Sequence, residues 1–193
     1  MAEKGTAATE TCSYARSDGS RCPGVVEDRE RGLCFWHDID ISKEGSDVRK
    51  RLEAWAEKGQ SMEGFQLRYA ALEGLKLSDK RNRDLRRANL FRANLQGASL
   101  FSVDLRSSEL LKANLAGANL NDALLQDVEL LGVNLDGARL ERVEWGEHCI
   151  NEQLAIQAER GGDRDESREK FKEAEEVYRT LRRAYAARAE PRL

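Results

Sequence analysis

Residues 83–140 read RDLRR ANLFR ANLQG ASLFS VDLRS SELLK ANLAG ANLND ALLQD VELLG VNLDG ARL. A leucine stands at every fifth position of this stretch: Leu85, Leu90, Leu95, Leu100, Leu105, Leu110, Leu115, Leu120, Leu125, Leu130, Leu135 and Leu140. The residue two before each leucine is small or β-branched, except at Arg83. Neither a helix nor a plain strand has a period of five. Each unit therefore offers one large and one small apolar side chain, and the units must stack as a solenoid to close a core.

A second period of twenty residues lies on top of the first. The units ANLQG, ANLAG and VNLDG begin at residues 93, 113 and 133. Four units therefore make one turn, and residues twenty apart lie above one another at roughly 4.8 Å if successive coils pair like strands. Stacked asparagine amides can hydrogen-bond along such a ladder. The predicted ladders are Asn94, Asn114 and Asn134, and Gly97, Gly117 and Gly137.

This pattern resembles the pentapeptide-repeat family, whose consensus is A-(N/D)-L-x-x. The resemblance covers twelve consecutive units. It implies a mainly β fold, a right-handed quadrilateral β-helix with four units per coil, in which the leucine and alanine of each unit face inward.

Three further units, FQLRY, AALEG and LKLSD, precede the main run in a shifted phase. The step from Leu77 to Leu85 is eight residues instead of five, so residues 80–82 are expected to bulge out as an insertion. Trp145 stands five after Leu140 and opens another unit. We therefore predict a β-helix over residues 65–147 with about four coils.

The composition favours a well-solvated chain without a strong field of either sign. The 193 residues have a net charge of -3, and 35% of them are charged, which argues against a general nucleic-acid binder. Apolar runs are too short to span a membrane, and the first residues lack the apolar centre of a signal peptide. We expect a cytoplasmic protein that does not insert into a membrane, with a disordered tail over residues 1–10.

Basic residues cluster around the phase shift, with Asp84 as the one acid among them. The main interpretation is a solvated, charged corner, and a binding site for an anionic partner is the alternative. The cluster comprises Lys80, Arg81, Arg83, Arg86, Arg87 and Arg92.

Residues 11–41 contain a set of candidate metal ligands, Cys12, Cys22, Cys34 and His37. A turn at Asp18–Gly19 would bring Cys12 and Cys22 onto neighbouring strands. The two-residue spacing between Cys34 and His37 is typical of a knuckle that presents two ligands to one ion. Three thiolates and one imidazole fit a closed tetrahedral Zn²⁺ site, which would be structural because no position stays open for a substrate.

The alternative for this segment is a set of unconnected buried cysteines or a disulfide, which a reducing compartment disfavours. A segment of about thirty residues with few apolar side chains also needs a cross-link, such as a bound metal ion, to fold. The segment resembles the small CCCH modules that precede pentapeptide repeats in some bacterial proteins. Its spacing differs from that of the zinc fingers that read DNA.

Helical patterns flank the repeats on both sides. Asp47 is the expected cap of a helix over residues 47–58, which would cover the open end of the first coil. Beyond the repeats, residues 150–190 predict an antiparallel helix pair interrupted at Gly161 and Gly162. That pair resembles the TPR-like helices that follow the repeats in some bacterial pentapeptide proteins.

His148 and Cys149 are the remaining histidine and cysteine. Adjacent side chains seldom form a catalytic pair, and no third group that could orient them is evident. We interpret His148 as a turn residue and Cys149 as a small buried apolar residue.

An apolar column is expected on one outer wall of the solenoid. Phe91, Leu111 and Leu131 each follow an inward leucine and stand twenty residues apart. A continuous exposed apolar ridge usually has a binding partner. The candidates are the chain's own helix pair, a second copy in a homodimer, or a different protein.

The sequence contains no glycine-rich phosphate loop, no paired carboxylates in an expected cleft and no triad pattern. We therefore expect a non-enzymatic scaffold or adaptor for protein–protein interactions. One alternative, implied by the family resemblance, is a DNA mimic that modulates gyrase or topoisomerase. Against it, residues 83–142 hold eight basic and eight acidic residues. The other alternative is a cytoplasmic regulatory or sensor part of a larger assembly, such as a membrane channel or a bacterial defence complex.

Overall fold

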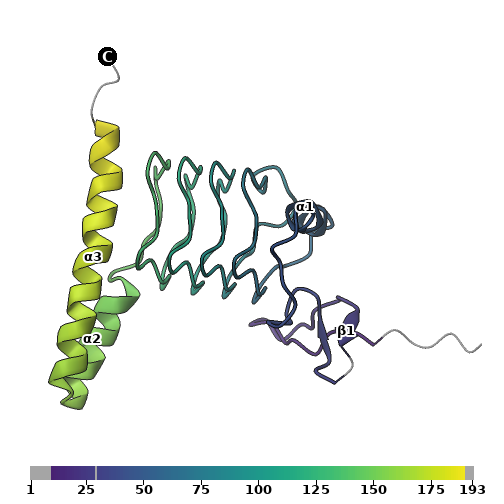
Figure 1. Cartoon of the computed structure of the whole chain (residues 1–193), viewed down its shortest axis with the longest axis horizontal. Coiled ribbons are helices and arrows are strands. Elements are labelled where there is room, and N and C mark those ends of the chain that lie inside the picture. The colour runs from purple at the N-terminus through teal and green to yellow at the C-terminus, as the bar shows by residue number, and fades with distance from the viewer. Residues whose placement is uncertain (1–9, 29, 190–193) are drawn as a thin grey trace, which may run out of the picture. The chain divides into compact units, whose positions relative to one another are not determined.

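The structure is a computed structural model that describes residues 10–28 and 30–189. The chain divides into two compact units, Met1–Ile41 and Ser42–Leu193 (Figure 1). Of the predicted tail, only Glu10 lies within the described residues. No helix in the described part of the chain is both long enough and apolar enough to cross a membrane.

The first unit is built from three small antiparallel pairings, one of which joins Thr11 to Val25. Ala15 pairs with Arg21 across a turn in which Gly19 has a φ of 83°, a conformation that glycine adopts without steric cost. Strand β1 (Val26–Asp28) then pairs with β2 (Leu33–Cys34). These pairings place three segments of the unit next to one another.

The second unit contains the repeats, and its coils are joined by parallel backbone bridges. These bridges link residues twenty apart, from Asp84 and Asp104 to Leu124 and Glu144. Four five-residue units therefore complete each turn of the chain, and the turns stack side by side (Figure 1). The repeats form a β-helix-like solenoid.

The first coil contains three extra residues. Its bridges, such as the one between Lys76 and Ser99, join residues twenty-three apart. The spacing returns to twenty at Asp84, so the insertion lies between Lys76 and Asp84. The predicted bulge at residues 80–82 falls within this segment.

The solenoid begins one unit earlier than the predicted boundary at residue 65. Met62 is fully buried, and its N–H donates to the carbonyl oxygen of Asp84 at 3.0 Å. Met62 therefore takes the leucine position of an additional unit, QSMEG, over residues 60–64. The three-residue insertion hides this unit in the sequence, because Met62 stands twenty-three residues before Leu85 instead of twenty.

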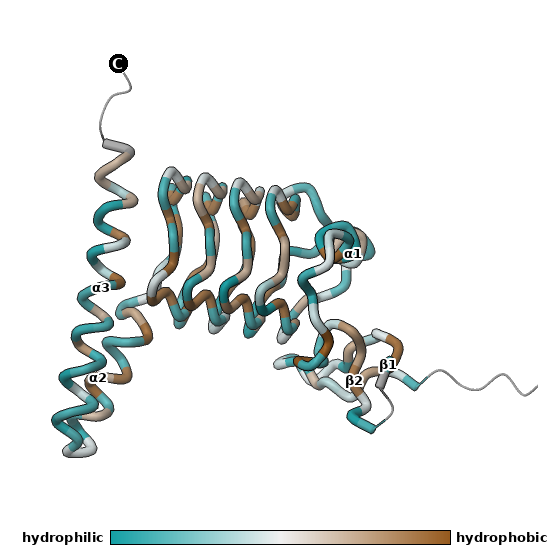
Figure 2. The backbone as a smooth tube through the Cα atoms, viewed as in Figure 1, coloured by the Kyte–Doolittle hydropathy of each residue, from teal (hydrophilic) through white to brown (hydrophobic). Residues whose placement is uncertain are grey.

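The interior of the solenoid is filled by the large and small apolar side chains of the units. The twelve leucines at five-residue spacing are at most 4% exposed, and the small residues two before them are also buried. Apolar and polar residues alternate along each coil (Figure 2). Close packing of this kind leaves no room for a substrate between the walls.

Helix α1 (Val48–Glu57) covers the first coil. The ring of Trp55 lies edge-on to Phe65 at 5.7 Å, and the Glu53 carboxylate accepts a hydrogen bond from the N–H of Lys76 at 2.9 Å. Asp47 occupies the N-cap position, but its side chain makes no capping hydrogen bond. The buried side of the helix, centred on Leu52, protects the end of the solenoid from water.

Helices α2 (Ile150–Gly161) and α3 (Arg164–Ala189) follow the last coil. Gly162 ends α2 in the left-handed conformation, and Asp163 accepts a hydrogen bond from the N–H of Glu166 at 2.9 Å. The two helices pack together, and α3 extends beyond α2 across the end of the solenoid (Figure 1). The hydroxyl of Tyr185 donates to the carbonyl oxygen of Leu140 at 3.2 Å.

Candidate metal centre and outer surfaces

The three pairings of the first unit bring Cys12, Cys22, Cys34 and His37 together. Their ligand atoms all lie within 4.8 Å of one another, and all four residues are buried. Cys12 and Cys22 come from the hairpin, Cys34 ends β2, and His37 follows in a tight turn. The N–H of His37 donates to the carbonyl oxygen of Cys34 at 3.0 Å, which fixes this turn. The cluster could hold a metal ion.

Three separations within the cluster are close to those expected for a tetrahedral site. Zn–S bonds of about 2.3 Å and Zn–N bonds of about 2.0–2.1 Å place two sulfurs about 3.8 Å apart, and sulfur and nitrogen about 3.5 Å apart. The Sγ atoms of Cys22 and Cys34 are 3.8 Å apart. His37 Nδ1 lies 3.5 Å from the Sγ of Cys12 and 3.4 Å from that of Cys34. All four cysteines of the chain are free.

Backbone amides and a glycine shape the thiol end of the cluster. The N–H of Gly24 donates to the Sγ of Cys22 at 3.3 Å, and the N–H of Cys34 donates to the Sγ of Cys12 at 3.4 Å. A Cβ atom at Gly24 would lie 2.8 Å from the Sγ of Cys34. Any larger residue at position 24 would therefore displace a candidate ligand.

The environment of the cluster orders the imidazole and perturbs the thiols. The ring of Tyr14 stacks on His37 with ring centroids 3.9 Å apart and an interplanar angle of 12°. The hydrogen bond between the two thiols lowers the pKa of Cys22 and raises the pKa of Cys34 to about 11. Burial raises the pKa of Cys12. Metal binding must therefore displace thiol protons.

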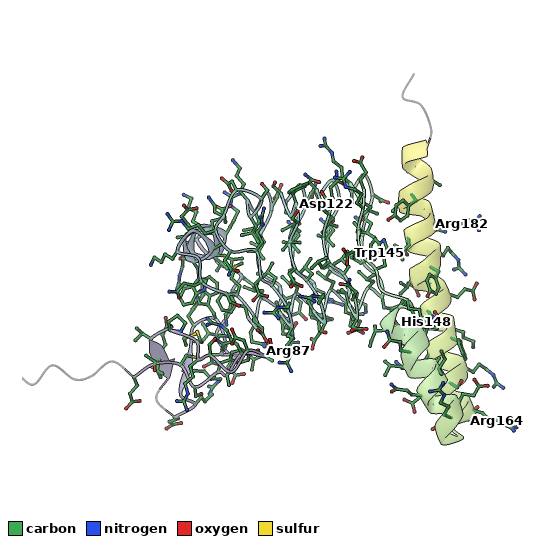
Figure 3. The ribbon with its side chains drawn as sticks, turned by 180° about the vertical axis from the view of Figure 1, so that it is seen from behind. Arg87, Asp122, Trp145, His148, Arg164 and Arg182 are labelled. Atoms are coloured by element: carbon green, nitrogen blue, oxygen red, sulfur yellow. The ribbon has the colours of Figure 1, made fainter. Side chains whose placement is uncertain are left out.

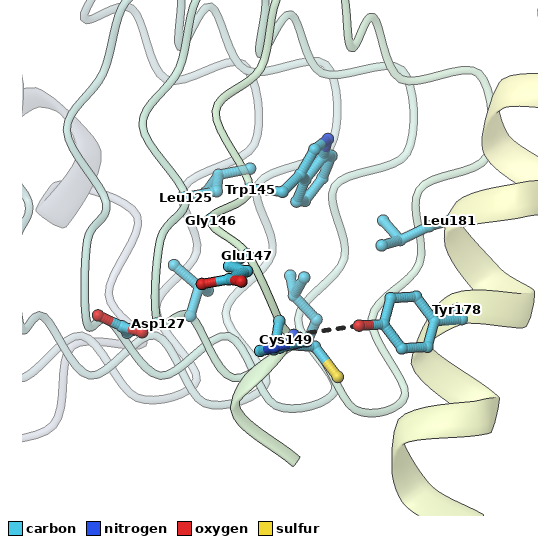
Figure 4. A pocket seen from close by; sticks show the side chains of 11 residues that line it. Leu125, Asp127, Trp145, Gly146, Glu147, Cys149, Tyr178 and Leu181 are labelled. Carbon is cyan, nitrogen blue, oxygen red and sulfur yellow. Dashed lines mark hydrogen bonds between the residues drawn. The ribbon is translucent and has the colours of Figure 1, made fainter. Parts of the chain in front are cut away.

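His148 and Cys149 lie beside a small pocket between the last coil and α3 (Figure 4). The hydroxyl of Tyr178 donates to the Glu152 carboxylate at 2.5 Å and accepts a hydrogen bond from the N–H of Cys149 at 3.3 Å. Burial and the bond to Glu152 raise the pKa of Tyr178 to about 12. The cavity of about 50 Å³ is far below the ~300–1,000 Å³ typical of ligand pockets.

The sequence interpretation of Cys149 needs a correction. Cys149 is only partly buried, and it occupies the N-cap position of α2 in an extended conformation. His148 is also partly exposed, and its Nδ1 lies 3.3 Å from the Glu152 carboxylate. The two residues therefore help to connect the solenoid to the helices.

Comparison with known proteins accounts for the solenoid. A model of pentapeptide repeats matches eight copies, over residues 81–107 and 110–142. A pentapeptide-repeat protein from Nostoc Pcc 7120 is 30% identical to this chain, and the match covers 49% of this chain and 74% of that one with a TM-score of 0.42. The chain belongs to the pentapeptide-repeat family.

Two other pentapeptide-repeat proteins of known structure match shorter parts. One, from the thylakoid lumen of Arabidopsis thaliana, is 33% identical over 47% of this chain and 58% of its own, with a TM-score of 0.33. HetL from Nostoc sp. strain PCC 7120, which is involved in heterocyst differentiation regulation, is 37% identical over 41% of this chain and 38% of its own, with a TM-score of 0.23. The search of curated proteins gave no match.

Three of the six cations in the predicted basic cluster of this pentapeptide-repeat protein lie beside acids. Arg86 forms a bidentate contact with Asp84 at 2.9 and 3.0 Å and also approaches the fully buried Glu63. Burial raises the pKa of Asp84, but hydrogen bonds from Arg86 and a serine outweigh that effect and lower it overall. Arg87 lies 3.5 Å from Glu63.

Within the residues that the structure describes, other cations of this cluster have weaker contacts with acids than Arg86 has, or none. Arg83 donates to the carbonyl oxygen of Ser78 at 2.8 Å, and Lys80 lies 3.6 Å from the Glu57 carboxylate. Arg81 is exposed. Pairing on this scale weakens the case for an anion site at the phase shift.

Phe91, Leu111 and Leu131 stand on one wall, called here the ridge wall, formed by the units that begin at residues 65, 88, 108 and 128. All three side chains are partly exposed. Helices α2 and α3 pack on the last coil, where Gln153 donates to the Asp127 carboxylate at 3.0 Å. The helix pair thus covers the end of the solenoid, and the ridge extends from that end over coils that the helices do not reach.

Sequence reasoning missed two neighbours of the ridge, Arg68 and Tyr69. Both lie in the first coil, and the N–H of Tyr69 donates to the carbonyl oxygen of Phe91 at 2.9 Å. The insertion places them twenty-three residues before the matching positions of the next coil. A search for that spacing on either side of the phase shift would have found them.

Proposed function

We propose that this protein is a non-enzymatic scaffold for protein–protein interactions, with an N-terminal module folded around a structural zinc ion. The main support is the solenoid interior, which leucine and small side chains fill completely. Chemistry and binding are thereby confined to the walls and the ends. Rigid walls built from regular coils are surfaces that partner proteins can recognise.

The zinc assignment follows from the donor set and its spacing. Cys12, Cys22, Cys34 and His37 would hold the ion, and three of their separations match tetrahedral thiolate and imidazole coordination. With four protein ligands, the ion supplies a cross-link between three segments of the module. It has no open position for water, so we assign it no catalytic role.

The DNA-mimic alternative receives little support from the walls. Asp104 and Asp122 carry bidentate contacts from Arg106 and Arg142, just as Asp84 does from Arg86. A wall that imitates the phosphates of a duplex needs carboxylates that are not neutralised. Figure 3 shows Asp122 and Arg87 on different walls, with charges of both signs around them.

Two measurements on the full chain test the proposal. Metal analysis of freshly purified protein should give about one equivalent of zinc, and values well under half an equivalent would contradict the metal assignment. Tagged protein isolated from its source cells should retain a partner in a fixed ratio by size-exclusion chromatography and mass spectrometry. Isolation as a bare chain at every salt concentration would contradict the scaffold assignment, and inhibition of gyrase supercoiling would favour the DNA mimic.

A further inference from the structure

The ridge wall carries a cluster in which cations surround an aromatic ring. The ring of Tyr69 lies edge-on to Phe91, with centroids 5.4 Å apart and an interplanar angle of 90°. The guanidinium carbon of Arg68 lies 5.4 Å from the Phe91 centroid and 5.9 Å from that of Tyr69. Arg92 places its guanidinium carbon 5.4 Å from the same Phe91 ring. One phenyl ring therefore holds two guanidinium groups in position.

The cations of this cluster differ from the three arginines of the solenoid that form bidentate pairs. Arg86, Arg106 and Arg142 are each bidentate with an aspartate. Among the described residues, neither Arg68 nor Arg92 has a carboxylate within ion-pairing distance. Guanidinium groups of this kind retain their capacity for bidentate contact with a carboxylate.

The cluster continues into the apolar ridge. The N–H of Arg92 donates to the carbonyl oxygen of Leu111 at 3.0 Å, so consecutive coils place Phe91 and Leu111 side by side. Lys112 follows Leu111 at the same corner as Arg92, and both have positive φ values, 58° and 54°. The wall thus presents an apolar line with cations along one margin. We call Arg68, Tyr69, Phe91, Arg92, Leu111 and Lys112 the aromatic–cation patch.

The margin of the ridge wall opposite the cations carries carboxylates, and these favour a peptide partner over a nucleic acid. Glu109 and Glu129 stack on the other side of the ridge. Partial burial is the main cause that raises the pKa of Glu129, and the neighbouring Glu109 adds to it, while Lys170 of α3 lowers it. A nucleic-acid backbone laid over the ridge would meet these carboxylates, whereas a peptide with carboxylates on one side only would not.

We propose that the aromatic–cation patch is a docking site for an acidic, apolar segment of a partner protein. Carboxylates of the segment pair with Arg68 and Arg92, and its apolar side chains lie on Phe91 and Leu111. This inference rests on the scaffold function and specifies the surface and the partner chemistry.

The test uses the full chain and a short labelled peptide in which glutamate alternates with leucine. Fluorescence anisotropy should show binding at sub-millimolar peptide, weakening as salt is raised. Arg68→Gln together with Arg92→Gln should weaken binding roughly tenfold or more, because two charge-assisted contacts are lost. Leu111→Ser should weaken it as well. The control Arg139→Gln removes an exposed arginine from a different wall and should change affinity by less than about twofold.

Several outcomes would overturn the docking site. These are no binding of the glutamate–leucine peptide, equal losses from the double variant and Arg139→Gln, equal binding of a glutamine–leucine peptide, or tighter binding of single-stranded oligothymidylate. Conversion of a dimer to a monomer by Leu111→Ser would assign the patch to a second copy instead. Circular dichroism of each variant must match that of the parent protein. If partners from source cells still bind the double variant, the scaffold function stands and uses another wall.

Discussion

The N-terminal unit and the solenoid bury very different kinds of side chain. In the described part of the first unit, the buried apolar residues are Phe35, Trp36 and the three clustered cysteines. The solenoid buries a continuous series of leucine and small residues from Met62 to Leu140. Burial of apolar surface stabilises the second at about 25 cal/mol per Å². The first has little such surface, which is why we propose that a metal ion cross-links it.

This difference implies two kinds of weakness. A solenoid stabilised by many similar contacts between neighbouring coils loses stability locally when one contact is removed. A module organised around one ion loses its fold when one ligand is removed. The two regions should therefore respond to different perturbations, and the following experiments separate them.

The largest effect is expected from loss of one metal ligand. Cys34→Ser, or a strong zinc chelator, should unfold residues 11–41 because metal binding supplies about 10–16 kcal/mol in small zinc modules. Hydrogen exchange measured by mass spectrometry should show fast exchange there and unchanged protection in the repeats. Cys149→Ser is the matched control and should leave the module protected. Joint unfolding of both regions would mean that they depend on one another.

A cavity in the repeats should act in the opposite way. Leu115 is 1% exposed, so Leu115→Ala should lower the free energy of unfolding of the solenoid by about 2–5 kcal/mol. Ala116→Ser, on the outer surface of the same unit, should be nearly neutral. Denaturant titration followed by circular dichroism measures both changes. Zinc content should stay the same in each, and equal effects from the two variants would contradict the inward assignment of Leu115.

A smaller effect separates ligand geometry from general stability. Gly24→Ala places a methyl group 2.8 Å from the Sγ of Cys34, so zinc affinity should fall roughly 10–100-fold. Competition with a chromogenic chelator measures this affinity. Gly97→Ala, in open space on the solenoid with a φ of 65°, should cost about 1 kcal/mol of stability without changing zinc affinity. Unchanged affinity in Gly24→Ala would show that the cluster tolerates displacement.

The smallest effect concerns charge on the ridge wall. The folded-state pKa of Glu129 is raised, so its charged form opposes folding at neutral pH. Glu129→Gln should therefore raise stability at pH 7 by roughly 0.5 kcal/mol or less, since the side chain is partly solvated. The difference from the parent protein should shrink as pH falls through the raised folded-state pKa, and it should be absent below the ordinary carboxyl value of 4.5. Glu73→Gln on an exposed position should show no such trend in thermal unfolding.

The repeats and the ligand set could be predicted from the sequence because each depends on local spacing. Five-residue periodicity states which side chains face inward, and the burial of Leu85 to Leu140 confirms it. The four candidate ligands could be named because cysteine and histidine are rare in this chain. Their geometry rests on three pairings that bring distant residues together, and zinc itself stays a prediction.

Other features depend on contacts that spacing does not encode. Met62 was missed because methionine replaces leucine and an insertion shifts its phase. The pairing of Arg86 with Asp84 and Glu63 depends on rotamers, so the basic cluster looked more available in the sequence than in the structure. The identity of whatever contacts the ridge depends on another molecule. The tail, apart from Glu10, lies outside the described residues.

Helical covers at both ends of the repeats have a consequence for assembly. An uncovered terminal coil presents unpaired backbone groups on which another solenoid could stack, and repetition of that event would build a filament. Here α1 covers the first coil, and Trp145 of the last coil forms a hydrogen bond with Tyr185 of α3. Both ends of the solenoid are therefore covered, which blocks stacking by another solenoid. Inserting one twenty-residue turn would increase the distance between the two helical covers by about 4.8 Å and leave each cover unchanged. The number of repeats encoded between the two covers therefore sets the length of the solenoid, in steps of one coil.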